Sequence, residues 1–340
     1  MSTNLAHVQA DDKQPMSRLK KALIVLAIIA LILVAAVVAL FFYIRVGVLG
    51  QLVTLDDPFP ETEGRPAVEE ETDTVNFLIL GSDSRISGGD PTYWEQDAQR
   101  TDTMILAQLS EKNNTLTVMS IPRDSWVDVP SVGMAKINAA YANGGPKLTI
   151  ETVETVTGVR IDHFLLVDFT TFKRLTDKLG GVTVNAVYWG GMKTLNGEEA
   201  LAFVRERQSL EHGDFSRVLR QQEWIRAIMS KVFNEGVLYD PQKTLGLIET
   251  VASDTAVDDS LGIPQMMEYA KKARNIRPDN VIFITAPWTG TGWSPDGRQS
   301  IVNLDYDKFG PLMNAWKEDN LKQFLDENQD DYPKLGSMVW

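Results

Sequence analysis

The sequence contains no cysteine in its 340 residues. Disulfide bonds, thiolate nucleophiles and cysteine-ligated zinc sites are therefore excluded. The sequence also lacks a phosphate-binding P-loop, a zinc-binding HExxH helix and the residue order of a serine–histidine–aspartate triad. His163 lies beside Asp162 ahead of an expected strand, where a lone histidine is more often structural than catalytic. Carboxylates and arginines are therefore the side chains to follow.

Positive charge is scarce. Lys and Arg number 33 against 46 Asp and Glu, and the net charge is −13 at pH 7. Nucleic acid is a poor partner for such a chain, because its phosphates would be repelled, and we expect no nucleic-acid partner. A local group of arginines in an acidic protein then carries information, and one such group occurs within residues 205–220.

One long hydrophobic run stands apart from the rest of the chain. Residues 22–44 hold no charged side chain and are numerous enough to span a bilayer as a helix. The run lacks the polar face of a core helix and is not followed by a small-residue cleavage site, which predicts an uncleaved transmembrane anchor at 22–45. Lys and Arg gather before it, so we expect a cytoplasmic tail (1–21) and an extracytoplasmic body of a single-pass cell-membrane protein.

Composition divides the remaining chain. Residues 46–73 are rich in Asp and Glu and include three prolines, which predicts a solvated acidic linker that acts as a plain spacer. Residues 74–235 form the predicted catalytic core. Residues 236–322 are expected to complete or extend the same domain, and 323–340 to form a loose tail.

The body alternates two kinds of pattern. Short β-branched or aromatic runs predict strands at 74–80, 104–109, 115–121, 164–168, 182–188 and 280–286. Helical patterns cover 135–143, 146–157, 170–179, 197–204, 214–233, 241–251, 262–275 and 306–318. Because strands and helices interleave, we predict an α/β fold with a central mixed β-sheet flanked by helices.

The first polar cluster lies between the first two predicted strands. Asp83 follows one strand and Asp102 precedes the next, and Arg85 and Arg100 accompany them. Carboxylates and arginines that converge at strand ends can hold a hard divalent cation and a phosphate together. The alternative is that Asp83 caps a turn and Asp102 pairs with Arg100. Spacing alone leaves both interpretations open.

A second cluster follows the third predicted strand. Pro122 ends that strand and presents Arg123 and Asp124 at its exit, where ligands of α/β proteins bind. The alternative is a surface ion pair.

The last cluster spans two predicted helices. Arg205 and Arg207 would diverge in a helix but share a side in extended backbone, so a joint ligand requires the first helix to end near Val204. In helix 214–233, one face carries Arg217, Arg220, Gln221 and Trp224, opposite an apolar stripe of Phe215, Val218, Leu219, Ile225, Met229 and Val232. Arginines near a helix N-terminus form a good anion cradle, and the alternative is a solvated basic face.

These clusters together resemble the LytR-CpsA-Psr family over roughly residues 74–233. The motifs are Gly81-Ser82-Asp83-Ser84-Arg85, Arg100-Thr101-Asp102-Thr103, Ser120-Ile121-Pro122-Arg123-Asp124, Lys136-Ile137-Asn138, Gly180-Gly181-Val182, Leu195-Asn196-Gly197, Arg205-Glu206-Arg207 and Arg217-Val218-Leu219-Arg220-Gln221-Gln222. The resemblance implies an extracytoplasmic phosphotransferase that moves a glycopolymer from a polyprenyl-pyrophosphate carrier to peptidoglycan, forming a phosphodiester. No family motif is placed after Gly236.

The resemblance also implies a role for individual residues. Asp83 and Asp102 would bind Mg²⁺ (or Mn²⁺) and, with Arg123, form the catalytic centre. The pyrophosphate would bind Arg100, Arg123, Arg205, Arg207, Arg217, Arg220 and Gln221, with the lipid tail in an apolar tunnel under the sheet. Two alternatives remain: a polyprenyl-pyrophosphate pyrophosphatase that uses water as acceptor, and a non-catalytic envelope regulator or lipid-binding module.

Overall fold

The computed structural model describes residues 53–61, 63–67, 73–82, 101–186, 191–206, 214–252 and 255–332. The predicted anchor at 22–45 lies outside these residues. Within them, no helix is long and apolar enough to cross a membrane.

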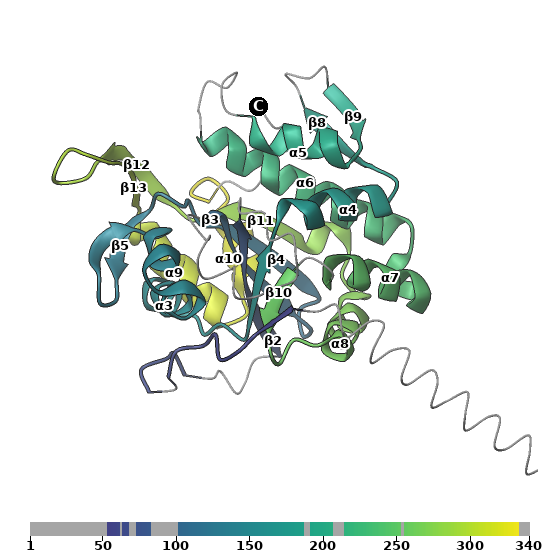
Figure 1. Cartoon of the computed structure of the whole chain (residues 1–340), viewed down its shortest axis with the longest axis horizontal. Coiled ribbons are helices and arrows are strands. Elements are labelled where there is room, and N and C mark those ends of the chain that lie inside the picture. Colours follow the sequence, from purple (N-terminus) through teal and green to yellow (C-terminus); the bar gives the residue numbers. More distant parts are fainter. Residues whose placement is uncertain are drawn as a thin grey trace, which may run out of the picture. The chain divides into compact units, whose positions relative to one another are not determined.

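In the described part of the chain, seven strands form the central sheet (Figure 1). Their order is β1 (Val53–Leu55), β10 (Thr255–Asp258), β7 (His163–Val167), β2 (Thr74–Ser82), β3 (Thr101–Ser110), β4 (Thr115–Ser120) and β11 (Val281–Thr285). The pairs β1–β10, β2–β7 and β4–β11 are parallel, and the other three are antiparallel. The predicted α/β fold with a central mixed sheet is confirmed.

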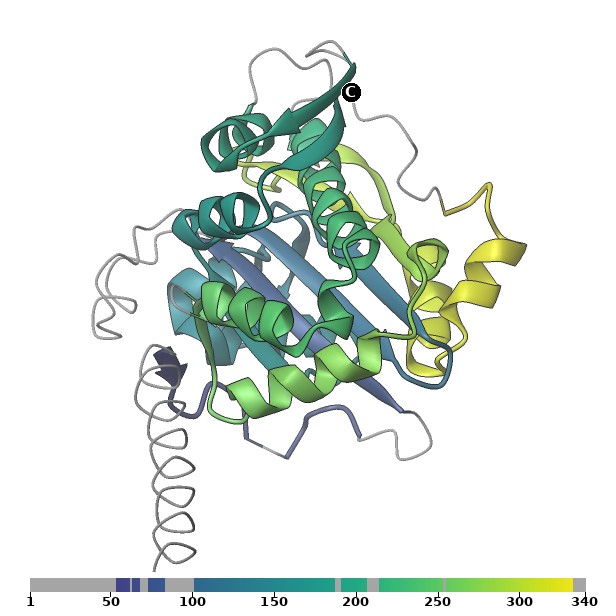
Figure 2. The same ribbon diagram turned by 90° about the vertical axis from the view of Figure 1, so that its right-hand side faces the viewer.

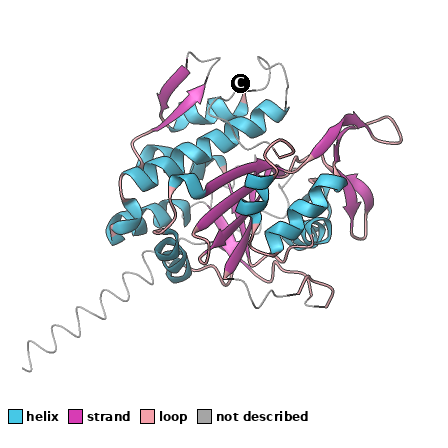
Figure 3. Ribbon diagram, turned by 180° about the vertical axis from the view of Figure 1, so that it is seen from behind, coloured by secondary structure: helices cyan, strands magenta, loops and turns pink. Residues whose placement is uncertain are grey.

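Helices and small hairpins surround this sheet (Figure 3). The helices are α3 (Ala139–Thr157), α4 (Phe169–Lys178), α5 (Gly197–Arg205), α6 (Asp214–Asn234), α7 (Pro241–Ala252), α8 (Ile263–Ala273), α9 (Tyr306–Lys317) and α10 (Leu321–Glu327). The hairpins pair β5 (Trp126–Val129) with β6 (Gly133–Lys136), β8 (Val182–Ala186) with β9 (Gly191–Leu195), and β12 (Trp288–Trp293) with β13 (Ser300–Leu304).

Alternating side chains give the sheet two apolar faces. Leu78, Leu80, Leu106 and Met119 point to one face, where they are fully buried in the same cluster as Trp316 of α9. The other face carries a smaller cluster that includes Ile105, Val118 and Phe283. Figures 1 and 2 show α6, α7 and α8 on the opposite side of the sheet from α3 and α9.

Local sequence accounts for where several helices begin and end. Asn196 caps α5, because its side chain accepts from the Glu199 N–H while the Glu199 carboxylate accepts from the Asn196 N–H. Asp168 caps α4 by accepting from the Thr171 N–H at 2.8 Å. Gly158 ends α3 in the left-handed conformation that favours glycine.

The predicted helix at 135–143 is wrong in its first part. Residues 133–136 form β6, and α3 starts at Ala139. Gly144 and Gly145 then interrupt α3 with non-helical angles, and Pro146 follows where the helix resumes.

Two predicted unstructured segments carry structure. Within the acidic segment, Arg65 donates to the Glu154 carboxylate at 2.6 Å and to the Ile161 carbonyl at 2.7 Å, and its side chain is 8% exposed. Phe59 packs against the main hydrophobic core, so the segment is not a plain spacer at Phe59 and Arg65, whereas Asp56, Asp57, Glu61 and Glu63 are exposed as a solvated linker predicts. In the predicted tail, α10 extends to Glu327 and buries Leu325.

Candidate functional site

The pairing of β2 with β3 brings two predicted site segments to one end of the sheet. Gly81 pairs with Thr103 and Ser82 with Thr101, so a bulge occurs at this end and Asp102 is its extra residue. Asp83, Arg85 and Arg100 lie outside the described residues, and so does the side chain of Asp102. Among the described side chains, no group of three or more His, Asp or Glu is gathered as a metal site.

The exit of β4 forms a tight turn. The Ser125 N–H donates to the Pro122 carbonyl at 2.9 Å, and the Ser125 hydroxyl donates to the same oxygen at 2.7 Å. Asp124 lies 3.0 Å from the Lys136 ammonium and 3.8 Å from Arg123 Nε. These contacts hold the Arg123 side chain, 18% exposed, beside the end of β4.

Helix α6 presents its first turns to this turn. Arg217 and Gln221, one helical turn apart, line a small pocket together with Arg123. The pocket is completed by Thr103, Met104, Ser120, Ile121, Pro122, Asp124, Val218 and Val302. The structure therefore brings together three of the residues that the sequence assigned to pyrophosphate binding.

A neighbouring glutamine attaches α6 to the sheet. Gln222 is 1% exposed, and its amide nitrogen donates to the Ile284 carbonyl at 2.7 Å, the Ser120 hydroxyl at 3.0 Å and the Thr285 hydroxyl at 3.2 Å. These acceptors belong to the ends of β4 and β11. The sequence analysis named Gln222 in a family motif but gave it no role, because helical spacing shows only that adjacent residues point in different directions.

The arginine face of α6 is buried rather than solvated. Arg220 is 1% exposed, donates to the Phe203 carbonyl at 3.2 Å and lies 4.9 Å from the centre of the Phe203 ring. Burial lowers the pKa of Arg220, and the negative charge of Glu206 opposes that shift. Trp224 stacks on Phe172 of α4 with ring centres 3.8 Å apart. The alternative of a solvated basic face is therefore wrong.

The end of α5 meets the condition set by the sequence. Arg205 is its last residue, and Glu206 has φ −58° and ψ 127°, which lies outside the helical region. The helix thus ends one residue after Val204. Arg207 lies outside the described residues, so its position relative to Arg205 stays a prediction.

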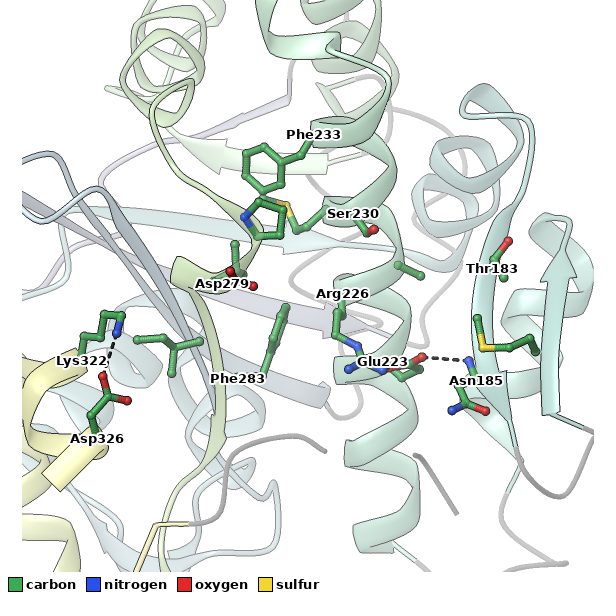
Figure 4. Close-up of a pocket in the computed structure, with 16 residues that line it drawn as sticks. Thr183, Asn185, Glu223, Arg226, Ser230, Phe233, Asp279, Phe283, Lys322 and Asp326 are labelled. Carbon is green, nitrogen blue, oxygen red and sulfur yellow. Dashed lines mark hydrogen bonds and ion pairs between the residues drawn. The ribbon is translucent and has the colours of Figure 1, made fainter. Parts of the chain in front are cut away.

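A larger cleft of about 650 Å³ lies on the other side of α6 (Figure 4). Glu223 and Arg226 of α6 line it together with Phe283 of the edge strand β11, and the Glu223 carboxylate is directed to Asn185 of β8. Burial raises the pKa of Glu223, although the Asn185 N–H at 2.9 Å and the ion pair with Arg226 oppose the rise. The cleft therefore combines an apolar wall with a charged pair held in place.

His163 has a structural environment, as its sequence context indicated. Its Nδ1 lies 3.1 Å from an Asp258 oxygen, and its Nε2 lies 2.8 Å from the Tyr269 hydroxyl. Burial would raise the pKa of Asp258, but hydrogen bonds from His163, Ser260 and the Phe164 N–H outweigh it and lower that pKa. The cluster ties α8 to strands β7 and β10.

The chain is similar to known proteins in sequence and in fold. A model of the LytR_cpsA_psr family matches residues 54–309. The cell wall biosynthesis protein LcpA of Corynebacterium glutamicum is 28% identical over 278 residues, covering 68% of this chain and 53% of LcpA. TagU of Bacillus subtilis, named a polyisoprenyl-teichoic acid–peptidoglycan teichoic acid transferase, is 38% identical over 172 residues, covering 48% of this chain and 53% of TagU.

The solved structure of TagT bound to LIIa-WTA has a TM-score of 0.59 and 26% identity, covering 77% of this chain and 99% of that one. The chain spans about half the length of the curated relatives it matches.

Proposed function

Because this chain belongs to the LytR_cpsA_psr family, we propose that it is an extracytoplasmic phosphotransferase of cell-wall assembly. It would move a glycopolymer from a polyprenyl-pyrophosphate carrier to peptidoglycan. One observation carries the proposal: Arg123, Arg217 and Gln221, from distant parts of the sequence, line one pocket at the sheet end that β2 and β3 share. The relative TagU is named a polyisoprenyl-teichoic acid–peptidoglycan teichoic acid transferase, which supports a transfer of this class.

The chemistry needs positioning and charge neutralisation more than covalent help from the protein. A sugar hydroxyl of peptidoglycan would attack the phosphorus attached to the glycopolymer. The bond from that phosphorus to the bridging oxygen breaks, polyprenyl phosphate leaves, and the hydroxyl proton passes to a base or to solvent. Guanidinium groups that bind phosphate oxygens with paired N–H donors stabilise the charge that builds on the leaving group.

We assign Mg²⁺ (or Mn²⁺) binding to Asp83 and Asp102. Carboxylate oxygens are the ligands these ions prefer, and the bulged pairing of Gly81–Ser82 with Thr101–Thr103 directs both chain segments to one strand end. When bound, the ion would neutralise phosphate charge beside the arginines. Arg100, Arg205, Arg207 and Arg220 are proposed to contribute further positive charge to the same pyrophosphate site.

The polyprenyl chain would lie on the less tightly covered face of the sheet. Phe77, Ile79, Leu116 and Val281 are only partly buried there, whereas Leu78, Leu80 and Leu106 on the opposite face are fully buried. The cleft of Figure 4 reaches this face, because Val281 and Phe283 line its wall. Residues 22–45 would anchor the protein in the membrane that holds such a lipid, with the N-terminal tail in the cytoplasm.

The decisive experiment uses the purified full chain with a polyprenyl-pyrophosphate-linked glycopolymer, a peptidoglycan acceptor and Mg²⁺. Arg123→Ala should lower the transfer rate by at least about a hundredfold, because it removes charge stabilisation from the transition state. The matched control is Arg277→Ala, an exposed arginine that does not line the pocket. Circular dichroism of both variants should match the wild type.

The same assay separates the other candidate functions. Chelation of the divalent ion should stop transfer, and adding Mg²⁺ or Mn²⁺ should restore it without any change in circular dichroism. Release of polyprenyl phosphate at the same rate without acceptor would indicate a pyrophosphatase. Lipid binding that survives chelation, with no product in any assay, would indicate a lipid-binding module or regulator and would refute the transferase.

A further inference from the structure

The β12–β13 hairpin projects from the body and carries two exposed tryptophans (Figure 1). Trp288 is 40% exposed and Trp293 is 69% exposed. Exposed apolar surface that gathers on one element can mark a contact with a partner, and two large aromatic rings contribute such surface here. The hairpin is therefore a candidate binding surface.

Strand pairing puts both rings on the side of the hairpin that meets the site. Directly paired residues share a face of a hairpin, and the pairs here are Trp288 with Leu304, Thr291 with Val302, and Trp293 with Ser300. Val302 also lines the pocket that contains Arg123. Its N–H donates to the Asp124 carbonyl at 2.9 Å. The face of the hairpin that carries Trp288 and Trp293, the tryptophan face, therefore adjoins that pocket at Val302.

The face has the chemistry of a saccharide platform. The C–H face of a pyranose ring packs on an indole ring, and neighbouring hydroxyls can bond to a threonine. Thr291 lies between the two tryptophans, while Gly290 and Gly292 add no side chain to the hairpin. The tryptophans pair with residues four apart on β13, a separation of about 13 Å, which fits several linked sugars.

We propose that this face binds the glycan strand of the peptidoglycan acceptor and holds a sugar hydroxyl toward the Arg123 pocket. The proposal rests on the proposed function, because it assigns the acceptor side of the same site. A membrane surface fits less well, since an anionic lipid surface attracts clustered Lys and Arg. Residues 288–304 contain a single basic side chain, Arg298, and its Nε lies 3.9 Å from a carboxylate oxygen of Asp296.

The test measures binding of the purified full chain to isolated peptidoglycan sacculi by co-sedimentation. Trp293→Ala should weaken binding by about tenfold, the effect of removing a central aromatic contact. Trp293→Phe should retain most of the affinity, because it keeps an aromatic ring. Tyr239→Ala is the matched control, since Tyr239 is 68% exposed but lies in the short turn after α6. Equal melting temperatures would show that all three variants fold.

Three results would overturn the platform. The first is a double variant Trp288→Ala/Trp293→Ala whose affinity for sacculi is unchanged. The second is a Tyr239→Ala variant that loses as much affinity for sacculi as Trp293→Ala. The third is a Trp293→Ala variant that binds phospholipid vesicles more weakly but binds sacculi as the wild type does. In the transfer reaction, Trp293→Ala should raise KM for the acceptor while kcat at saturating acceptor changes little.

The two proposals fail in distinguishable ways. Tryptophan-dependent binding to sacculi by a wild-type protein that transfers nothing would support the platform and refute the transferase. Normal transfer with normal acceptor KM in the tryptophan variants would refute the platform and leave the transferase standing.

Discussion

Gln221 and Gln222 are adjacent, but only mutation of Gln222 should lower the stability of the fold. Gln222→Ala removes a buried amide that donates to Ile284, Ser120 and Thr285. Unsatisfied buried acceptors cost about 1–3 kcal/mol each, and some relaxation follows, so we expect a loss of about 3 kcal/mol in the free energy of unfolding. In a domain of this size that lowers Tm by about 6–12 °C.

Gln221→Ala should slow transfer without lowering stability. Gln221 is half-buried at the pocket, so the free energy of unfolding should change by no more than about 0.5 kcal/mol. Transfer should fall by about tenfold, because one hydrogen-bond donor to the pyrophosphate is lost. At temperatures below its Tm, Gln222→Ala should also slow transfer. The variant lacks the contact that holds α6, and with it Arg217, against the turn that contains Arg123.

Thermal melts and transfer rates of the two variants, measured on the same preparations, test this reasoning. A Tm for Gln222→Ala within about 2 °C of the wild type would mean that the amide does not join α6 to the sheet as the structure has it. Normal transfer by Gln221→Ala would remove that residue from the pyrophosphate site.

Two further predictions concern stability. Arg65→Ala should cost about 3–5 kcal/mol of unfolding free energy, because Glu154, 3% exposed, would stay buried without its partner. The control Lys147→Ala breaks only exposed pairs and should cost less than about 0.5 kcal/mol in denaturant titrations. The lowered pKa of Asp258 means that its ionised form stabilises the fold above its unfolded pKa of about 3.9 and loses that contribution as pH falls through the folded pKa. The stability gap between wild type and Asp258→Asn should therefore shrink below about pH 4 in pH-dependent melts.

Helix α6 shows what periodicity can and cannot predict. Its extent and the grouping of Arg217, Arg220 and Gln221 follow from the sequence, because i, i+3 and i+4 positions share a face. The sequence could not show that this face is buried. α6 packs against the sheet through Ile225 and against α4 through Trp224, so more than one of its faces is covered. Such burial depends on neighbours that come from elsewhere in the chain.

The sheet likewise has strands that the sequence predicts and strands that it does not. The long strands β2, β3 and β4 were predicted because each has a continuous β-branched or apolar run. Strands β10 and β12 were missed because one has only four residues and the other contains Gly290 and Gly292. β10 also pairs with β1 and β7, which are distant in sequence, and local patterns carry no record of such partners.

The Ile121-Pro122-Arg123-Asp124 segment explains why donor and acceptor sides of the reaction would meet at β4. Pro122 ends the strand, after which the Arg123 side chain faces the first turns of α6. The carbonyl of the next residue, Asp124, accepts a hydrogen bond from the Val302 N–H, which fixes the base of the β12–β13 hairpin. One turn therefore positions both the arginine proposed to bind phosphate and the proposed glycan platform. A displacement of this turn would change the distance between the phosphorus and the attacking hydroxyl oxygen, and phosphoryl transfer depends on that positioning.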